Sequence, residues 1–402
     1  MSRPKKQPTS ISADAPNINE PATITEKASM PSKKIIHLML DAGRSSIKYQ
    51  AFVNNETGTT CFDKTQQPPV MKTESLVCCV PSVPFGELGA FSLSRAKDEN
   101  NKDVVEHWVV GSSARLQGKE YIAMSDGENY KVDYFPLLAL GAIASLPNLL
   151  ELSTGTSDKR RTLHIRLSTL SLASPLELKK AIEKCKWIAV DGVRYRLCFS
   201  KQGFLGFPEG YGASLWASER FDDKQFHTFD IGYGTATISE YSNLGKLPKR
   251  VTCSPNGGGG VATLIKEFSL ALSNTDSSKM IRPSQLREIL ETATVGDNGI
   301  SAIAPDGENI GAELENAIHS WMKDSPLAYA LDDVSVKARR SKVTLCGGAF
   351  AIAPVQMLIK ERLLKASIPE SNLLIPENPG TVALSEMKKL YLGETTDVKQ
   401  AA

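Results

Sequence analysis

Two segments far apart in the sequence carry the same order of residues that could do chemistry. Each is an apolar stretch that ends in an aspartate, passes through a short turn of glycine and hydroxyl residues, and returns as a second apolar stretch. Asp41 holds this place in residues 35–48, and Asp230 holds it in residues 226–238. A strand-end carboxylate can hold a hydrated divalent cation, and small turn residues let backbone N–H groups approach phosphate oxygens. We therefore interpret both segments as phosphate-binding hairpins.

The first turn has side chains that suit phosphate. Gly43, Arg44, Ser45 and Ser46 would line the β- and γ-phosphates, and Lys48 would point its ammonium group at phosphate oxygens. Taken alone, the segment fits an ordinary surface hairpin equally well, because Asp-x-Gly turns are common between strands. The spacing Ser45-x-x-Lys48 also matches a penicillin-binding-protein motif, but that motif needs a helix start and a later Lys-Thr-Gly, which the sequence lacks.

The second turn consists of Gly232, Tyr233, Gly234 and Thr235. It is not a dinucleotide-binding fingerprint, because Thr237 replaces the third glycine and a strand, not a helix, follows. The better interpretation is a second phosphate hairpin, with Asp230 accepting a hydrogen bond from a water that a metal polarises.

Two further glycine stretches add to the pattern. Gly257, Gly258 and Gly259, with Gly260, precede a predicted helix, so their N–H groups and the helix N-terminus could face an anion; a flexible loop is the alternative. Gly347, Gly348 and Ala349 follow a predicted strand, which suits a chain that passes close to a flat group such as adenosine, although diglycine turns are common.

Glu209 lies between a proline and a glycine, just ahead of a predicted helix. A carboxylate there could orient the water that attacks a γ-phosphate. The alternative is an acidic first-turn residue that the helix dipole favours.

Composition sets the broad class. The chain has 402 residues, 41% hydrophobic and 23% charged, as in ordinary soluble proteins, and this length predicts two lobes of roughly 150–200 residues each. Residues 1–34 hold six basic and three acidic side chains, which leaves 41 basic and 42 acidic ones elsewhere. We therefore predict no direct nucleic-acid binding by the folded body.

Residues 1–33 are rich in Pro, Ser and Thr, lack aromatic residues, and are predicted to be disordered. A solvated tail is one interpretation, and a basic arm that docks a partner or DNA is the other.

Without an apolar leader or a run of 18 apolar residues, neither a signal peptide nor a membrane span is predicted. No Cys-x-x-Cys spacing occurs, so we expect buried free thiols in a reducing cytoplasm; the seven cysteines are Cys61, Cys78, Cys79, Cys185, Cys198, Cys253 and Cys346.

Strand and helix patterns recur in both halves, so each lobe is predicted to be a mixed β-sheet flanked by helices. The predicted strands are 35–41, 47–53, 76–80, 106–111, 163–170, 186–190, 193–199, 203–207, the hairpin 226–241, and 342–346. The predicted helices start at 112 and 174 and span 134–150, 261–272, 283–293, 308–323, 351–365 and 380–391, and a further helix follows residues 208–213 and ends at about Glu219.

Taken in order, the two phosphate hairpins and the adenosine diglycine resemble the actin, sugar-kinase and heat-shock ATPase superfamily. The sequence is most similar to plasmid-partition actins of bacteria and archaea, the ParM/StbA type, over roughly residues 34–393. Residues 108–114 are similar to the family's strand–Val-Gly–helix segment, residues 208–213 to its catalytic Pro-Glu segment, and residues 378–383 to its closing helix. Tyr233, Ala236 and Ala349 depart from its pattern.

The resemblance implies a two-lobed α/β fold with ATP or GTP and Mg²⁺ in the cleft between the lobes. Residues 34–213, completed by 372–393, would form lobe I, residues 214–371 lobe II, and residues 1–33 and 394–402 disordered tails. Asp41 and Asp230 would hold the metal through water, Glu209 would orient the attacking water, and the diglycine would pass beside the nucleoside.

The implied function is a slow ATPase of the cytoskeletal type, whose nucleotide state controls a homopolymer filament in plasmid segregation or intracellular positioning, with a DNA-binding adaptor protein as a further partner. A small-molecule kinase of the same superfamily is the alternative, although no conspicuous substrate motif accompanies the hairpins. A membrane-tethered homologue would need an anchor helix, and residues 380–391 are short and better explained by packing. A chaperone would need a long C-terminal substrate domain.

Overall fold

Two β-sheets organise the residues that the computed structural model describes, which are 34–54, 70–97, 99–127, 129–155, 161–171, 175–275 and 281–392. These residues fall within one compact unit, Lys33–Ala402. The predicted tails, residues 1–33 and 394–402, lie outside the described residues, as does Ser174, the predicted start of a helix. Within the described ranges, no helix has the length and apolar character needed to cross a membrane.

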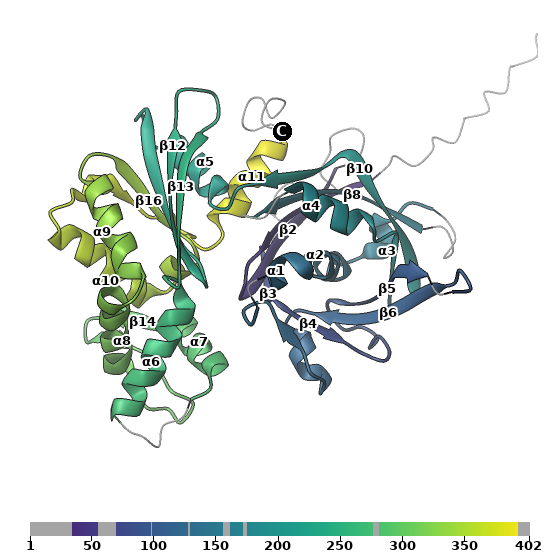
Figure 1. Cartoon of the computed structure of the whole chain (residues 1–402), viewed down its shortest axis with the longest axis horizontal. Helices are drawn as coiled ribbons and strands as arrows, with labels where there is room; N and C mark the ends of the chain where they lie inside the picture. The colour runs from purple at the N-terminus through teal and green to yellow at the C-terminus, as the bar shows by residue number, and fades with distance from the viewer. Residues whose placement is uncertain are drawn as a thin grey trace, which may run out of the picture. The chain divides into compact units, whose positions relative to one another are not determined.

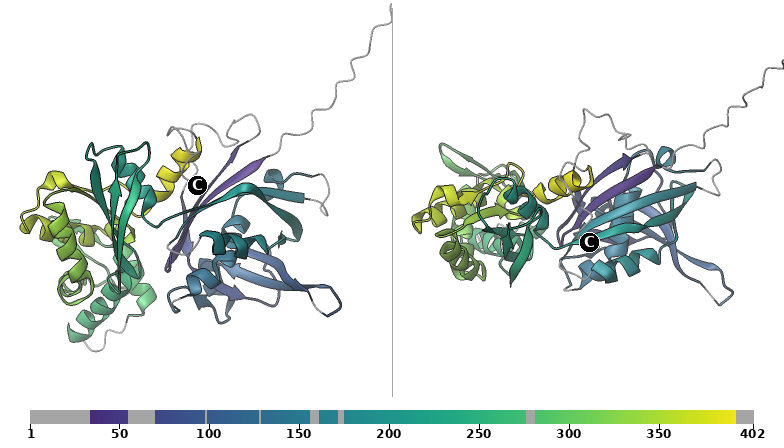
Figure 2. Two further views of the ribbon diagram at one scale, coloured as in Figure 1. Left: turned by 45° about the horizontal axis from the view of Figure 1, so that its top comes forward. Right: turned by 90° about the horizontal axis from the view of Figure 1, so that it is seen from above.

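The first sheet curls around helix α2 (Phe135–Ala144), as Figures 1 and 2 show. Every residue of α2 is buried, which explains why its sequence is apolar on all sides. Smaller helices accompany it: α1 (Tyr130–Asp133), α3 (Leu149–Leu152), α4 (Pro175–Glu183) and a 3₁₀ helix at Ser112–Gln117. The strands follow one another across this sheet in the order β3-β2-β1-β8-β10-β9-β5-β6-β4-β7. Along the chain they are β1 (Ile35–Ala42), β2 (Ser46–Asn54), β3 (Met71–Glu74), β4 (Leu76–Cys79), β5 (Ala90–Lys97), β6 (Asp103–Val110), β7 (Ile122–Ala123), β8 (Arg161–Leu170), β9 (Trp187–Val190) and β10 (Val193–Phe207).

The second sheet has the order β13-β12-β11-β16-β17. Its strands are β11 (Gln225–Ile231), β12 (Thr235–Ser242), β13 (Lys249–Gly257), β16 (Lys342–Cys346) and β17 (Leu373–Leu374). One face packs into a core with α6 (Val261–Thr275), α7 (Pro283–Thr292), α8 (Gly311–Asp324), α9 (Leu327–Ala338) and α10 (Ala353–Lys365). A small hairpin, β14 (Thr294–Gly296) and β15 (Gly299–Ser301), follows α7. The sequence thus builds mixed sheets flanked by helices, as predicted.

The two sheets share one pairing scheme. In the first, β3–β2 and β2–β1 are antiparallel, whereas β1–β8 and β8–β10 are parallel. In the second, β13–β12 and β12–β11 are antiparallel, whereas β11–β16 and β16–β17 are parallel. Strands β1 and β11 therefore hold equivalent places, and Asp41 and Asp230 lie near the carboxyl ends of equivalent strands.

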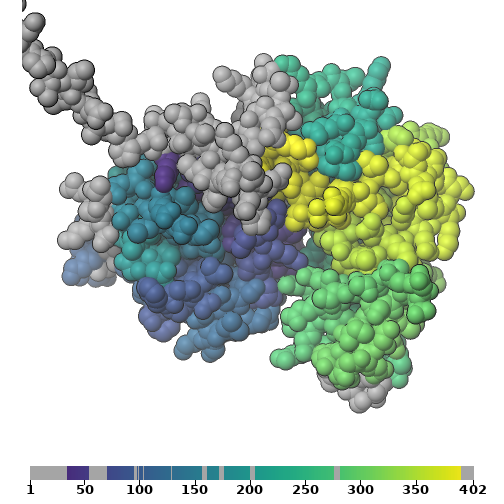
Figure 3. Space-filling view, turned by 180° about the vertical axis from the view of Figure 1, so that it is seen from behind, coloured from purple at the N-terminus to yellow at the C-terminus, as the bar shows by residue number. Residues whose placement is uncertain are grey.

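Helices α5 (Tyr211–Ser218) and α11 (Val382–Leu392) pack against each other between the sheets. A β-carbon on Gly212 would lie 2.3 Å from the carbonyl oxygen of Ala383, so only glycine allows this close crossing. Seen from behind in Figure 3, the yellow C-terminal surface adjoins both the blue surface of the first half and the green surface of the second. The apolar cluster around these helices takes residues from both sheets: Met39, Phe52, Phe226 and Tyr241, with Leu215, Leu384 and Met387.

Several elements differ from those predicted. The apolar helix expected at 134–150 is interrupted: α2 ends at Ala144, and α3 starts at Leu149 after Asn148, which has a left-handed conformation with φ of 57°. The strands expected at 193–199 and 203–207 are one strand with an irregularity between Phe199 and Phe204. The helix expected from Ser112 is a 3₁₀ helix without a side-chain cap. Strand β13 was not predicted, because its residues alternate poorly and are mostly exposed at the sheet edge.

The described cysteines are free thiols, but not all are buried as predicted. Cys78, Cys185 and Cys346 are buried, Cys198 and Cys253 are partly exposed, and Cys79 is exposed. The expectation of buried thiols is therefore wrong for Cys79, which sits at the end of a short strand with its side chain on the solvent side.

His37 gives the fold a testable acid sensitivity. Its ring is buried, stacks on Phe52 with centroids 4.7 Å apart, and lies opposite Arg166 in the sheet. Burial, and secondarily the charge of Arg166, lower the pKa of His37 to about 4. Because the unfolded chain binds this proton near pH 6.5, stability falls as pH drops from about 6.5 towards 4, by about 2 kcal/mol at pH 5. We expect His37→Phe to show a smaller difference in melting temperature between pH 8 and pH 5 than the unchanged protein; an equal difference would contradict this.

Candidate functional site

A cavity of about 570 Å³ lies where the carboxyl ends of β1 and β11 come together. Ligands of open α/β sheets bind at the carboxyl ends of the parallel strands. Most of the predicted site residues line this cavity: Asp41, Gly43, Arg44, Ser45, Ser46, Lys48, Glu209, Asp230, Gly232, Tyr233, Gly234, Thr235, Gly347 and Gly348. Gly257, Gly258, Gly259 and Ala349 are not among the lining residues. Residues from three separate parts of the sequence are thus brought to one place.

The first hairpin has a tight turn held by backbone bonds. The Gly43 N–H donates to the Ser46 carbonyl at 3.0 Å, and a β-carbon on Gly43 would lie 2.9 Å from that oxygen. Ser75, at the bend between β3 and β4, supports the turn: its hydroxyl donates to the Gly43 carbonyl at 2.6 Å and its N–H to the Ser45 carbonyl at 3.0 Å. Lys48 lies opposite Asp41 in the register, with its ammonium 3.5 Å from the carboxylate.

The second hairpin is braced by the start of α6. The Gly232 N–H donates to the Thr235 carbonyl at 2.9 Å, and the N–H groups of Val261 and Ala262 donate to the Gly232 and Tyr233 carbonyls at 3.1 and 2.8 Å. A β-carbon on Gly260 would lie 2.3 Å from the Tyr233 carbonyl oxygen, so glycine is needed for this contact.

The glycine run 257–260 therefore differs from the predicted phosphate-facing loop. Gly257 ends strand β13, and the first N–H groups of α6 are used by the second hairpin. These glycines bring helix and turn together, and their direct binding of nucleotide stays a prediction.

The diglycine lies directly against Asp230. Gly347 has φ of +96°, and a β-carbon there would stand 2.2 Å from the Asp230 Oδ1 atom. Its N–H donates to the Pro379 carbonyl at 3.0 Å. Gly348 lines the cavity, and among the described residues no atom other than those of its two chain neighbours lies within 4 Å of the place its β-carbon would take. Ala349 is fully buried in the core of the second half.

The carboxylates of the cavity concentrate negative charge. Burial, then the charge of Glu209 and that of Asp41, raise the pKa of Asp230 to about 7, against the lowering effect of Lys48 and Lys131. Glu209 is itself paired, since its Oε1 atom lies 3.2 Å from the Lys131 ammonium. Such a site favours a cation beside Asp230.

The donor set fits a hydrated Mg²⁺ ion. Asp41 and Asp230 provide hard oxygen atoms, and Mg²⁺ in phosphate sites takes one or two carboxylates and fills its other positions with water and phosphate oxygens. Within the described ranges, no group of three or more His, Cys, Asp or Glu side chains is arranged to hold a metal.

A second, small cavity of about 30 Å³ lies behind Glu209 and Asp230. Thr228, Thr237 and Ser239 of the second sheet line its wall. A cavity of this size with polar residues on its wall can hold a water molecule. The two carboxylates thus border a place suited to an ordered water.

Several lining residues were not predicted from the sequence. Lys131 on α1, Lys72 on β3, and Arg287 and Glu291 on α7 all line the main cavity. An isolated charged residue on a short or amphipathic element belongs to no sequence motif that would mark it as a site residue. Ser171 and residues 379–383 also line the cavity; Ser171 follows the carboxyl end of β8, so the strand topology would have pointed to it.

Comparisons with known proteins were made for the whole chain. No protein-family model matches it, and no curated protein matches it. Solved structures do. A ParM filament from Clostridium botulinum has a TM-score of 0.59 at 15% identity, over 88% of this chain and 98% of that one. The actin-like protein Alp7A has a TM-score of 0.59 at 13% identity, over 90% of this chain and 97% of that one. Bacillus thuringiensis ParM with ATP has a TM-score of 0.56 at 14% identity, over 90% of this chain and 98% of that one.

The chain has the actin-like fold. The predicted α/β architecture, similar to ParM-type proteins, is confirmed. The matches cover 88–90% of this chain. Because the identities are 13–15%, this likeness concerns the fold.

The diglycine offers a matched pair of substitutions. Gly347→Ala should lower the melting temperature by several degrees, because a β-carbon would strike the Asp230 carboxylate and the positive φ is strained for alanine, at a cost of roughly 1–3 kcal/mol. Gly348→Ala should leave the melting temperature nearly unchanged, because its β-carbon meets open space. Thermal melting of both variants checks this, and equal shifts would show that the contact with Asp230 is not the cause.

Proposed function

We propose that this protein binds ATP with Mg²⁺ in the main cavity, hydrolyses it slowly, and uses the nucleotide state to control assembly into a homopolymer filament. The observation that carries the proposal is the meeting of two glycine-containing turns, each preceded by a strand-end aspartate, on one cavity wall. This arrangement suits a chain of phosphates with a cation between two carboxylates.

Phosphate binding would fall to the first hairpin and its cations. The Lys48 ammonium would exchange its partner Asp41 for a phosphate oxygen, and the Arg44 guanidinium, which lies over the Gly234 position of the second hairpin, would bind from the opposite side. Bound Mg²⁺ would neutralise charge on the phosphate oxygens. Gly348, with open space in front of its backbone, would let the nucleoside approach closely.

Glu209 is the best candidate to orient the attacking water. It borders the small polar cavity with Asp230, which gives it a place to hold a water next to the phosphate hairpins. Its ion pair with Lys131 holds the carboxylate in one orientation. A water-positioning carboxylate acts in the transition state more than in binding.

Filament assembly is proposed from the fold. One of the similar structures is a ParM filament, and another is the actin-like protein Alp7A. For this chain, we propose a cytoplasmic cytoskeletal role in segregating or positioning DNA such as a plasmid, in which the folded body polymerises and a separate DNA-binding adaptor joins it to its cargo.

Sedimentation and electron microscopy with ATP, ADP and a non-hydrolysable ATP analogue, together with a phosphate-release assay, test the proposal. We expect pelleting and filaments with ATP and the analogue, and loss of filaments after hydrolysis. If filaments do not form but small sugars or carboxylates raise nucleotide turnover, the small-molecule kinase alternative is correct. Absence of nucleotide binding would overturn both.

Asp230→Asn should weaken Mg²⁺-dependent ATP binding by at least about tenfold, or about 1.4 kcal/mol, with no loss of melting temperature. The amide keeps the shape of the side chain but removes a buried charge that is costly in the folded protein. Calorimetric titration with and without Mg²⁺ measures this. A variant with normal Mg²⁺-dependent affinity would remove Asp230 from the proposed metal site.

Glu209→Gln should slow phosphate release by ~10²–10⁴-fold while ATP affinity stays near normal, because only the transition state loses the oriented water. Any filaments should then persist longer after a single addition of ATP. Phosphate release and pelleting over time measure these effects. Normal turnover would leave Glu209 only the structural role of pairing with Lys131.

A further inference from the structure

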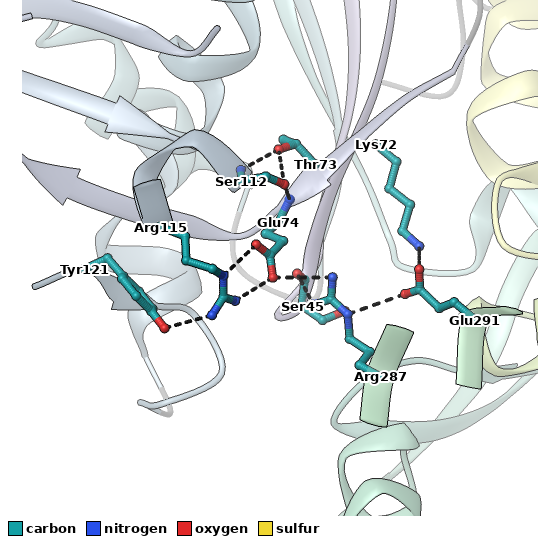
Figure 4. A network of polar contacts seen from close by, with 9 residues as sticks. All are labelled: Ser45, Lys72, Thr73, Glu74, Ser112, Arg115, Tyr121, Arg287 and Glu291. Carbon is teal, nitrogen blue, oxygen red and sulfur yellow. Dashed lines mark hydrogen bonds and ion pairs between the residues drawn. The ribbon is translucent and has the colours of Figure 1, made fainter. Parts of the chain in front are cut away.

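Four charged side chains face one another across the rim of the main cavity, two on strand β3 and two on helix α7 (Figure 4). The Lys72 ammonium lies 2.9 Å from the Glu291 carboxylate, and the Arg287 guanidinium lies 3.5 Å from the Glu74 carboxylate. We call Lys72, Glu74, Arg287 and Glu291 the β3–α7 clasp. It joins an element of the first sheet to an element of the second half.

The spacing of the clasp is matched on its two sides. Lys72 and Glu74 are two residues apart on a strand, so they lie on one face, about 6.6 Å apart. Arg287 and Glu291 are four residues apart on a helix, so they share a face at a rise of about 6 Å. Opposite charges meet at both points. If β3 moved along α7 by the spacing of one pair, Lys72 would lie opposite Arg287, which carries the same charge. The clasp therefore favours one alignment of β3 and α7.

Each side of the clasp is fixed within its own half. Glu74 accepts two hydrogen bonds from Arg115, at 2.7 and 3.1 Å, and Arg115 in turn donates to the Tyr121 hydroxyl at 2.9 Å. Helix α7 is held by the buried side chains of Leu286, Ile289 and Leu290. Movement between β3 and α7 would therefore break the clasp itself before it broke these supports.

Arg287 also reaches the first phosphate hairpin. Its Nη1 atom donates to the Ser45 carbonyl at 3.4 Å, the same oxygen that accepts the Ser75 N–H. Its contacts with Glu74 and Glu291 are each 3.5 Å. Its partners thus lie at comparable, rather long distances, so no one contact dominates. One side chain of the second half therefore contacts both the turn and the strand that supports it.

The two ion pairs of the clasp differ in burial. The side chains of Lys72 and Glu291 are 44% and 40% exposed, whereas those of Arg287 and Glu74 are 21% and 15% exposed. Exposed pairs are screened by water and salt and contribute little. The Arg287–Glu74 contact is therefore the stronger point of the clasp.

We propose that the β3–α7 clasp holds the cavity closed and that Arg287 is a positioning residue for the turn of the first phosphate hairpin. The effect on nucleotide rests on the proposed function, whereas the closure itself does not. If Arg287 is removed, nucleotide should still bind, but it should escape faster because the rim opens and the Ser45 turn loses a donor.

The test compares Arg287→Met with Arg287→Lys, Glu74→Gln and the double variant Glu74→Gln/Arg287→Met. Lys360→Met is the matched control, because Lys360 pairs with Glu370 at 2.6 Å on the surface of the second half. Release of a fluorescent ATP analogue is measured by stopped flow. Small-angle X-ray scattering of the nucleotide-free protein at low and high salt gives a radius of gyration that does not depend on nucleotide binding.

We expect Arg287→Met to release the analogue about tenfold faster, the loss expected for a charge-assisted contact, with Arg287→Lys intermediate because lysine cannot span the same acceptors. Lys360→Met should match the unchanged protein. The double variant should be no faster than Arg287→Met alone, because both changes remove one interaction. The radius of gyration should rise with salt in the unchanged protein and already be raised in Arg287→Met.

The proposal would be overturned if the effects of Glu74→Gln and Arg287→Met on the release rate were additive. It would also be overturned if Arg287→Met released the analogue at the normal rate and had an unchanged radius of gyration. If the unchanged protein binds no nucleotide, the proposed function fails and the scattering alone decides on the clasp. A similar drop in melting temperature for Arg287→Met and Lys360→Met, with faster release only in the first, would support positioning over a general loss of stability.

Discussion

The parallel pairing of β11 with β16 is the constraint on which the rest of the site depends. It sets Asp230 beside Cys346, so the backbone that leaves β16 at Gly347 must pass directly against the Asp230 carboxylate. A side chain at Gly347 would collide with the Asp230 carboxylate, which is half-buried at the wall of the main cavity. A buried carboxylate of this kind needs compensating cations, and Lys48, Lys131 and the proposed Mg²⁺ are the groups available to supply that charge.

The sequence predicted those parts of the site whose chemistry is local. Both hairpins, the diglycine and Glu209 are contiguous motifs, and the structure brings them to one cavity. Lys131, Lys72 and Arg287 could not be predicted, because each is a single charge on a short strand or helix that gains its meaning only from what lies opposite. Their positions depend on how α1, β3 and α7 pack, which no local pattern encodes.

The glycine run 257–260 shows how one composition fits two structural uses. Its composition suggests an anion-binding loop, but the same freedom of the backbone also allows a helix to start directly against a turn. In this fold the second use applies, because the N–H groups of Val261 and Ala262 are occupied by the carbonyls of Gly232 and Tyr233. Composition alone cannot distinguish these uses, since both require residues without a β-carbon.

The two halves use one strand arrangement, yet their hairpins are supported differently. The second turn is held by backbone N–H groups of α6, which belongs to the same half and moves with it. The first turn is held by Ser75 within its own half and by Arg287 from α7 of the other. A hairpin held by hydrogen bonds within its own half thus faces one whose support includes an ion-pairing side chain from across the cavity. A change in the distance between the halves would therefore alter the contacts of the first hairpin more than those of the second. The first hairpin is also where Arg44 and Lys48 are proposed to bind phosphate.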